Sequence, residues 1–124
     1  MSSFFLKFSG KVVPGKKRGW SLGFPTLNIS VPQDFGLDCG VYVSRVKTPL
    51  GIFLGALHYG SRETFGEKEP SIEVHLLDFK GNLYGEKVEI EVLQKIREVR
   101  VFSDAKSLKQ QIAEDVAAVR GLVV

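Results

Sequence analysis

The sequence predicts a mainly β protein, a small closed barrel of antiparallel strands with one C-terminal α-helix packed outside it. Two observations predict this fold. Along most of the 124 residues, short segments rich in β-branched and aromatic residues are separated by Gly, Pro and Asp. Apolar residues recur at helical spacing in one stretch near the end of the chain. Several short strands followed by one helix are typical of a closed barrel that carries the helix on its surface.

The strand pattern occurs in six segments, which comprise residues 4–8, 24–31, 41–46, 52–57, 71–79 and 87–93. In the last segment Val88, Ile90 and Val92 alternate with glutamates, so we expect one face of that strand to be in water. Residues 48–51 (Thr-Pro-Leu-Gly) and 80–82 (Lys-Gly-Asn) are typical of hairpin turns. The strands on either side of each turn are therefore expected to pair.

The C-terminal helix is expected to begin after Ser103, because serine is a good N-cap, and Asp104 suits the positive end of the helix dipole. The apolar positions at helical spacing are Leu108, Ile112, Val116 and Val119. Gly121 can end the helix, since glycine is the usual residue just past a last turn. We expect the apolar stripe to pack against the barrel.

Length and composition indicate one globular domain, because 124 residues suit a single core and 25% of them are charged. The one cysteine, Cys39, excludes an internal disulfide and favours a reducing, cytoplasmic location. No apolar run approaches the roughly 20 residues of a membrane-spanning helix. The N-terminal residues lack the basic start of a signal peptide, and Lys7 interrupts their apolar stretch. We therefore expect neither secretion nor a membrane partner.

Charge is distributed unevenly along the chain. The first 33 residues contain five basic side chains and no acidic one, and carry +5. The remaining residues contain 12 basic and 14 acidic side chains and carry −2. A local basic segment on a nearly neutral body is consistent with an anionic ligand, either nucleic acid or a nucleotide polyphosphate. It is also consistent with a solvated turn that binds nothing.

Residues 10–17 (Gly-Lys-Val-Val-Pro-Gly-Lys-Lys) nearly match the phosphate-binding P-loop pattern. Lys17 stands where that loop has a Ser or Thr metal ligand, and residues 18–21 do not start a convincing helix, so we reject a P-loop. The glycines can still expose backbone N–H groups beside mobile cations, an arrangement that binds phosphates without a helix. The alternative is a basic surface loop.

Thr26 and Asn28 follow Pro25 and lie two residues apart, so in a strand their side chains share one face. A hydroxyl and an amide oxygen side by side are hard donors, which Mg²⁺ accepts while it keeps waters and substrate phosphates as its other ligands. Pro25 would stiffen the approach to the strand because its φ is fixed. The alternative is that these are ordinary turn residues.

Glu73 lies within an apolar strand pattern, on the face opposite to Ile72 and Val74. A carboxylate in apolar company is costly unless it is paired, and such an acid is a candidate general base. The alternative is a strand-edge glutamate paired with a lysine. His75 on the same face suits packing or hydrogen bonding better than catalysis, and two histidines with one cysteine cannot form a zinc site.

An ordered set of motifs resembles one known family. In chain order the motifs are Val12-Val13-x-Gly15, Arg18-Gly19, Leu22-Gly23-Phe24-Pro25-Thr26-x-Asn28, Gly40-Val41-Tyr42, Gly60-x-Arg62-x-Thr64-Phe65-Gly66, residues 72–79 (Ile-Glu-Val-His-Leu-Leu-Asp-Phe) and Leu83-Tyr84-Gly85, followed by Arg97, Phe102 and the closing helix. From about Phe8 to Arg120 this set resembles the riboflavin kinases, in particular the kinase module of bacterial bifunctional FAD synthetases. The Gly-Phe-Pro-Thr-x-Asn segment is its most specific part.

The resemblance implies a six-stranded antiparallel Greek-key-type barrel and a set of site residues. Thr26 and Asn28 match the positions that hold Mg²⁺, and Glu73 matches the catalytic acid that takes the proton from the riboflavin 5′-hydroxyl. Arg97 and Phe102 match the segment that closes on the flavin, which Glu73 also contacts. The positions implied to bind the nucleotide are Gly15, Lys16, Lys17, Arg18, Gly19, Gly23, Pro25, Thr26 and Asn28.

The sequence departs from the family pattern at four positions. Trp20 stands where an Arg is usual, so the phosphate loop has one positive charge fewer at that position. Lys16 and Lys17 can compensate for this missing charge. His58 stands where Asn is common, Glu63 where Pro is usual, and Val99 where an acid is usual. His58 and Val99 bear on flavin affinity. None of these departures falls at the positions of Thr26, Asn28 or Glu73 themselves.

The expected activity is transfer of a phosphoryl group from Mg-ATP to riboflavin, giving FMN and ADP, by a single domain over residues 1–124. The adenylyltransferase module of the bifunctional enzymes is expected to be absent. We expect a monomer, unless the chain is part of a bifunctional FAD synthetase, and no nucleic-acid partner. Two alternatives are a non-catalytic flavin-binding barrel and a basic barrel that binds single-stranded nucleic acid.

Overall fold

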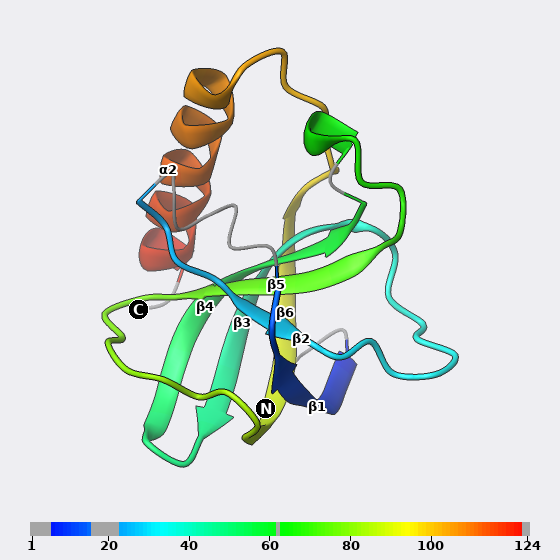
Figure 1. Ribbon diagram of the computed structural model, residues 1–124. Helices are drawn as coiled ribbons and strands as arrows, with labels where there is room; N and C mark the ends of the chain where they lie inside the picture. Colours follow the sequence, from blue (N-terminus) through cyan, green and yellow to red (C-terminus); the bar gives the residue numbers. More distant parts are fainter. Residues whose placement is uncertain (1–5, 16–22, 62, 123–124) are drawn as a thin grey trace.

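Six antiparallel strands close into a barrel, and one helix lies against its outer surface (Figure 1). The computed structural model describes residues 6–15, 23–61 and 63–122. The strands are β1 (Leu6–Val13), β2 (Leu27–Ile29), β3 (Gly40–Thr48), β4 (Gly51–Gly60), β5 (Ser71–Leu76) and β6 (Lys87–Arg97). A short 3-10 turn η1 (Glu63–Phe65) and helix α2 (Ala105–Leu122) complete the described elements. The predicted mainly β barrel with a C-terminal helix is confirmed.

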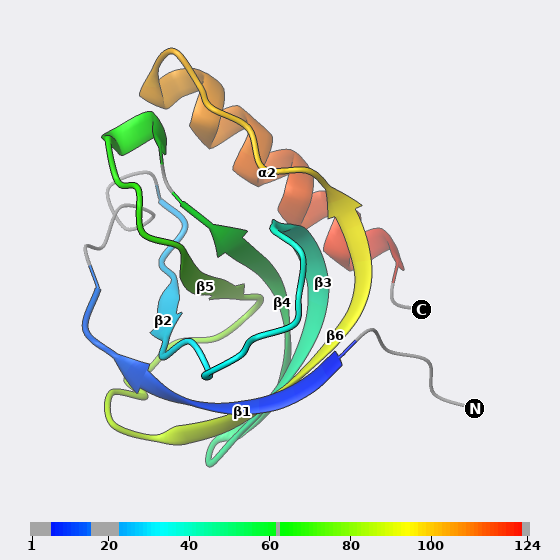
Figure 2. The same cartoon turned by 90° about the vertical axis from the view of Figure 1, so that its right-hand side faces the viewer.

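The strand order around the barrel is β1-β2-β5-β4-β3-β6. Strands β3, β4 and β5 follow one another in space as in sequence, and β6 returns to pair with β3 on its other side. This arrangement is a Greek key. Strands β1 and β2 close the remaining gap between β6 and β5, and α2 stands outside the ring (Figure 2).

One predicted hairpin is confirmed and the other is wrong. The turn between β3 and β4 forms as expected, with Thr48 Oγ1 accepting from Leu50 N at 3.0 Å and donating to Gly51 O at 2.9 Å. Strands β5 and β6 do not pair, because β5 lies between β2 and β4. Residues 77–86 instead cross one end of the barrel, where Leu83 is buried at 2% exposed. Burial of this apolar side chain outweighs the local turn preference.

Several strand boundaries differ from the prediction. Strand β1 runs on to Val13, whereas β2 spans three residues of the predicted 24–31. Pro25 has no N–H and cannot continue a ladder, which limits β2 on its N-terminal side. Strand β5 ends at Leu76, so Phe79 turns back to pack against Phe53 with ring centroids 5.0 Å apart.

Two apolar clusters stabilise the fold, one inside the barrel and one beneath α2. The inner cluster consists of buried residues from every strand and from the crossover: Val12, Ile29, Tyr42, Val46, Leu57, Ile72, Val74, Leu76, Leu83, Val88, Ile90 and Val92. The predicted inward face of the last strand is thereby confirmed. The outer cluster joins Val119 and Val116 of α2 to Val43 and Leu77. The predicted packing of the helical stripe against the barrel is confirmed as well.

Strand β6 carries two bulges that face the helix. Val41 and Tyr42 of β3 pair with Arg97 and Lys95 of β6, so one residue of β6 is skipped between them. Val43 and Ser44 pair with Gln94 and Val92, so a second residue is skipped there. The two extra residues on β6 are Leu93 and Ile96, and both pack in the cluster beneath α2. A bulge re-aims side chains and bends its strand. These bulges therefore help to shape the surface on which α2 rests.

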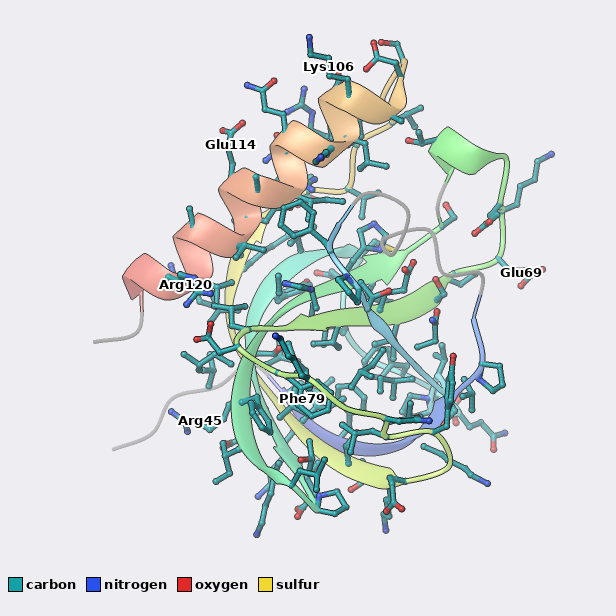
Figure 3. All side chains as sticks on the ribbon, turned by 60° about the vertical axis from the view of Figure 1, so that its left-hand side comes forward. Arg45, Glu69, Phe79, Lys106, Glu114 and Arg120 are labelled. Carbon is teal, nitrogen blue, oxygen red and sulfur yellow. The ribbon has the colours of Figure 1, made fainter. Side chains whose placement is uncertain are left out.

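Helix α2 begins one residue later than predicted. Asp104, not Ser103, is the N-cap, because its Oδ1 accepts a hydrogen bond from Ser107 N at 2.7 Å. That N–H bond holds the pKa of Asp104 below its usual range. Gly121 lies inside the helix, which ends at Leu122. Lys106 and Arg120 mark the first and last turns of α2 in Figure 3.

In the described ranges of the chain, no helix is both long and apolar enough to cross a membrane.

Candidate active site

Three neighbouring strands bring polar side chains together on the outer face of the barrel. Glu73 on β5 lies directly opposite Asn28 on β2 and directly opposite His58 on β4. Opposed residues of antiparallel strands point to the same face, with Cβ atoms about 4.5–5.5 Å apart. This face is the outer one, because the alternate residues Ile72 and Val74 fill the interior. Glu73 and His58 are nearly buried, at 6% and 7% exposed.

Thr26 joins this group from the segment just before β2. Its Oγ1 donates a hydrogen bond to Glu73 Oε1 at 3.2 Å. The structure therefore brings the Thr26 and Asn28 pair and the Glu73 carboxylate into one place. A hydroxyl that donates its proton keeps lone pairs, so Thr26 can bond Glu73 and still offer its oxygen to a cation.

Gly15 closes against the Asn28 side chain. A Cβ atom at residue 15 would overlap the Asn28 side-chain amide. A larger residue at this position would therefore have to push the Asn28 side chain aside, although the backbone angle of residue 15 does not itself favour glycine. Gly15, the second residue after β1, thus packs directly on the Asn28 side chain.

His75, two residues after Glu73 on the same face, is tied to the segment that carries Thr26. Its Nδ1 lies 2.7 Å from the Pro25 carbonyl oxygen. A carbonyl can only accept, so Nδ1 carries the proton and donates. The ring also packs edge-on against Phe24, with centroids 5.5 Å apart. The prediction that His75 is a packing or hydrogen-bonding residue is confirmed.

Three cavities meet at this group of side chains. One of about 250 Å³ is mainly apolar and is lined by Pro25, Thr26, Leu27, His75, Leu76, Phe79, Lys80 and Gly81. A second, of about 300 Å³, is lined by Gly15, Asn28 and Glu73, and also by Glu67 and Glu69. The third, of about 30 Å³, lies between the barrel and α2, and it is lined by Phe24, Thr26, Val41, Ala56, His58, Glu73, His75, Arg97, Ile112 and Asp115. The third cavity connects the group, because it shares Thr26 and His75 with the first cavity and Glu73 with the second.

Arg97 stands at the wall of the third cavity in a two-pronged ion pair with Asp115. Its Nε and Nη2 donate to the two oxygens of that carboxylate at 2.9 and 2.8 Å. The two side chains are 15% and 5% exposed. Gln111 donates a further hydrogen bond to Asp115 at 3.1 Å. The pair joins the end of β6 to the middle of α2.

Phe102 lies next to Arg97 but does not line any of the three cavities. The Arg97 and Arg100 guanidinium carbons are 6.0 and 5.4 Å from the centre of its ring. Its backbone N–H donates to Thr64 Oγ1 at 2.9 Å, which ties the segment before α2 to η1. Arg97 and Glu73 thus line the same cavity, whereas Phe102 lies in the segment between β6 and α2.

Asp115 is the site residue that sequence reasoning missed. The signal was present, because Asp115 falls among the apolar positions Ile112, Val116 and Val119 on the buried side of the predicted helix. A carboxylate on an apolar stripe requires a partner. The partner, Arg97, is 18 residues away in the chain, and only the packing of α2 on the barrel shows it.

Four predicted nucleotide-binding residues, Lys16, Lys17, Arg18 and Gly19, lie outside the described residues, as does Trp20. Gly23 is described and has a positive φ of 87°. Of the other departures from the family pattern, Glu63 is exposed at the start of η1. Val99 packs against the backbone of Gly60, where a Cβ would lie 3.0 Å from its Cγ2.

A closed barrel that carries a buried carboxylate beside a hydroxyl and an amide, with cavities around them, has the features of a small-molecule site with a candidate general base. The chain belongs to the riboflavin kinase family, because the family model described as "Flavokinase: Riboflavin kinase" matches residues 3–123. The resemblance found in the sequence motifs is therefore confirmed.

Individual relatives agree with this assignment. The RNA-binding riboflavin kinase RibR of Bacillus subtilis (strain 168) is 40% identical over 112 residues, which cover 90% of this chain and 48% of RibR. The bifunctional riboflavin kinase/FMN adenylyltransferase of Haemophilus influenzae is 41% identical over 108 residues, which cover 86% of this chain and 35% of that protein. The chain thus spans about a third to a half of the length of these relatives.

Solved structures share the fold. A crystal structure from Streptococcus pneumoniae described as a macrolide-efflux protein has a TM-score of 0.81 and 31% identity, over 93% of this chain and 38% of that one. A riboflavin kinase from Trypanosoma brucei has a TM-score of 0.64 and 26% identity, over 94% of this chain and 76% of that one.

Proposed function

We propose that the chain transfers a phosphoryl group from Mg-ATP to the 5′-hydroxyl of riboflavin, giving FMN and ADP. One observation carries this proposal within the family: Thr26, Asn28 and Glu73 converge where three cavities adjoin. Phosphoryl transfer depends mainly on positioning two substrates in line and on stabilising charge. A carboxylate between separate cavities can face the hydroxyl of one substrate while the phosphates of the other lie beside it.

Glu73 is proposed to accept the proton of the riboflavin hydroxyl as it attacks. Its position on a central strand, paired on both sides, fixes the direction of the carboxylate. The hydrogen bond from Thr26 orients the carboxylate oxygen that receives it. Ionised Glu73 can then orient the attacking hydroxyl by accepting its hydrogen bond.

The donor set fits a magnesium ion. Thr26 and Asn28 offer neutral oxygens beside a carboxylate, and Mg²⁺ takes few protein ligands when it also binds substrate phosphates. Among the described residues no group of three or more His, Cys, Asp or Glu side chains could hold a metal by itself. When bound, the ion would offset the charge of the phosphates beside Glu67, Glu69 and Glu73.

The remaining site residues are proposed to divide between the two substrates. Gly15 and Gly23, together with Lys16, Lys17, Arg18 and Gly19, would supply backbone N–H groups and cations to the phosphates. The apolar cavity beside Thr26 suits the nucleoside, because it offers apolar walls next to the proposed metal ligands. The same placement brings Pro25 into contact with the nucleotide.

The flavin is proposed to bind on the side of Arg97 and Phe102, next to Glu73. The cavity there is only about 30 Å³, about the volume of one water molecule, and cannot hold a tricyclic ring. Binding of the ring therefore requires the side chains between α2 and the barrel to move apart. The Arg97–Asp115 pair lies at that contact.

Incubation of the chain with riboflavin, ATP and Mg²⁺, followed by chromatography, tests the activity. We expect FMN and ADP in equal amounts, and we expect no FMN when EDTA replaces Mg²⁺. Riboflavin binding without ADP release would instead identify a non-catalytic flavin-binding barrel. Formation of FMN at the same rate with EDTA would refute the metal assignment alone.

Replacing Gly15 by Ala is expected to weaken Mg-ADP binding by about tenfold or more, because the new Cβ must displace the Asn28 amide. Isothermal titration with Mg-ADP measures this effect. Gly36→Ala is a matched control, since a Cβ at residue 36 meets nothing within 4 Å. Equal affinities in the two variants would show that the position of Asn28 does not matter for the nucleotide.

The absence of a nucleic-acid partner, the monomeric state, the cytoplasmic location and the single domain over residues 1–124 stay predictions. The name of RibR includes "RNA-binding", so a test of RNA binding by this chain is worthwhile. We expect a short single-stranded RNA to show only weak, nonspecific affinity for this chain at physiological salt. Tight binding with a steep salt dependence would contradict the prediction.

A further inference from the structure

Within the described residues, few contacts hold the segment that carries Thr26 in place. Strand β2 begins only at Leu27, so its ladder with β5 does not reach Thr26. Pro25 has no N–H to offer a neighbouring strand. Thr26, which donates its hydroxyl hydrogen bond to Glu73, therefore lies just before the first residue of the shortest described strand.

His75 supplies a fixed point from the opposite strand. It donates to the Pro25 carbonyl at 2.7 Å, one residue before Thr26, and its ring packs edge-on against Phe24. His75 shares the outer face of β5 with Glu73 and is anchored by the ladder between β4 and β5, opposite Ala56. One rigid strand thus holds both the carboxylate and the backbone next to its hydrogen-bond donor.

We propose that His75 is a positioning residue, which holds the segment before β2 so that the Thr26 hydroxyl faces Glu73. The imidazole does not act on the substrates chemically. It works through the Pro25 carbonyl, and it lines both the apolar cavity and the small cavity beside Glu73. This inference rests on the proposed function, because it assigns Thr26 a task in binding the magnesium nucleotide.

Loss of the hydrogen bond from His75 to the Pro25 carbonyl should displace Thr26 far enough to weaken binding of the magnesium nucleotide. A misplacement of about 1 Å at a site for phosphoryl transfer can cost orders of magnitude in rate. His75→Leu keeps the approximate size of the side chain and removes the donor. His75→Asn keeps a donor at nearly the same place, since the Asn side-chain nitrogen and imidazole Nδ1 are both bonded to Cγ.

The experiment measures Mg-ADP affinity by calorimetry, and kcat and KM for Mg-ATP and for riboflavin, in both variants. We expect His75→Leu to weaken Mg-ADP binding and to raise the KM for Mg-ATP by about tenfold, while the KM for riboflavin stays within about twofold. His75→Asn should restore most of the loss. Thr48→Val is a matched control, because it removes a side-chain to backbone hydrogen bond in the β3–β4 turn. It should change thermal stability without changing either KM.

Two outcomes would overturn the proposal. One is unchanged Mg-ADP affinity in His75→Leu, and the other is an equal loss in His75→Leu and His75→Asn when both variants unfold at the wild-type temperature. The second outcome would assign the effect to ring packing instead of the hydrogen bond. If the wild-type chain makes no FMN, the proposed function fails, and the Mg-ADP titration alone then decides the role of His75.

Discussion

Glu73→Gln is expected to lower the kcat for FMN formation by about 10²- to 10⁴-fold, the usual contribution of a general base. The amide keeps the size of the side chain and can still accept the Thr26 hydrogen bond, but it cannot take a proton at neutral pH. Binding of Mg-ADP and of riboflavin should each change by no more than about threefold. Steady-state kinetics and calorimetric titrations separate the two effects.

A matched control for this variant exists on the opposite side of the barrel. Glu91 is also a strand carboxylate on the outer face, and it pairs with Arg45 at 3.3 Å. Glu91→Gln should leave kcat at its wild-type value. Wild-type turnover in Glu73→Gln would remove Glu73 from the role of base. A loss of nucleotide affinity that matched the loss of kcat would assign Glu73 to binding instead.

Asp115→Ala is expected to destabilise the protein by about 3–5 kcal/mol, because it leaves the Arg97 guanidinium buried without its carboxylate. That is a large part of the total stability of a small domain, which is roughly 5–15 kcal/mol. The melting temperature should fall by about 10 °C or more. Thermal and urea unfolding, followed by circular dichroism, measure the change.

Arg120→Ala provides the comparison at an exposed two-pronged pair, and Asp78 itself is kept because its positive φ of 57° would be strained in an alanine. Arg120 donates to both oxygens of Asp78, at 2.9 and 3.1 Å, but the two side chains are 53% and 74% exposed. Water screens such a pair, so its loss should barely move the melting temperature. Equal shifts in Arg120→Ala and Asp115→Ala would contradict the argument from burial.

A double variant separates the buried charge from the lost contact. In Arg97→Met with Asp115→Leu neither charge remains, and apolar side chains of similar size fill the space. Much of the stability lost in Asp115→Ala should return, because replacing both partners of a buried pair is often neutral. Riboflavin binding by this double variant then shows whether the Arg97–Asp115 pair contributes to the flavin site.

The alternation of apolar and polar residues was sufficient to predict most faces of the barrel. Val88, Ile90 and Val92 point inward as their spacing indicates, and Val116 and Val119 rest on the barrel. The sequence motif around Thr26, Asn28 and Glu73 likewise predicted that these side chains lie together, and the structure brings them into one place. Such patterns are local, and a strand or a helix has a fixed periodicity that places each side chain on a known face.

Only part of the strand pairing was predictable from local patterns, because the β3–β4 hairpin formed as its turn residues indicated and the second hairpin did not. The turn residues at 80–82 suggested a hairpin, yet β5 and β6 lie on different sides of the barrel. The turn residues predict that the chain turns there, but they do not predict which strand the following segment pairs with. The partner is decided by which arrangement buries the most apolar surface, including Leu83 at the barrel end.

The sequence by itself determined the fold class, the family and the chemical character of the site. The tertiary structure decided which distant groups meet: Thr26 with Glu73, His75 with the Pro25 carbonyl, and Arg97 with Asp115. The physical reason is one of range. Propensity and periodicity act over a few neighbouring residues, whereas these contacts join groups 18 to 50 positions apart and exist only once the barrel has closed around its core.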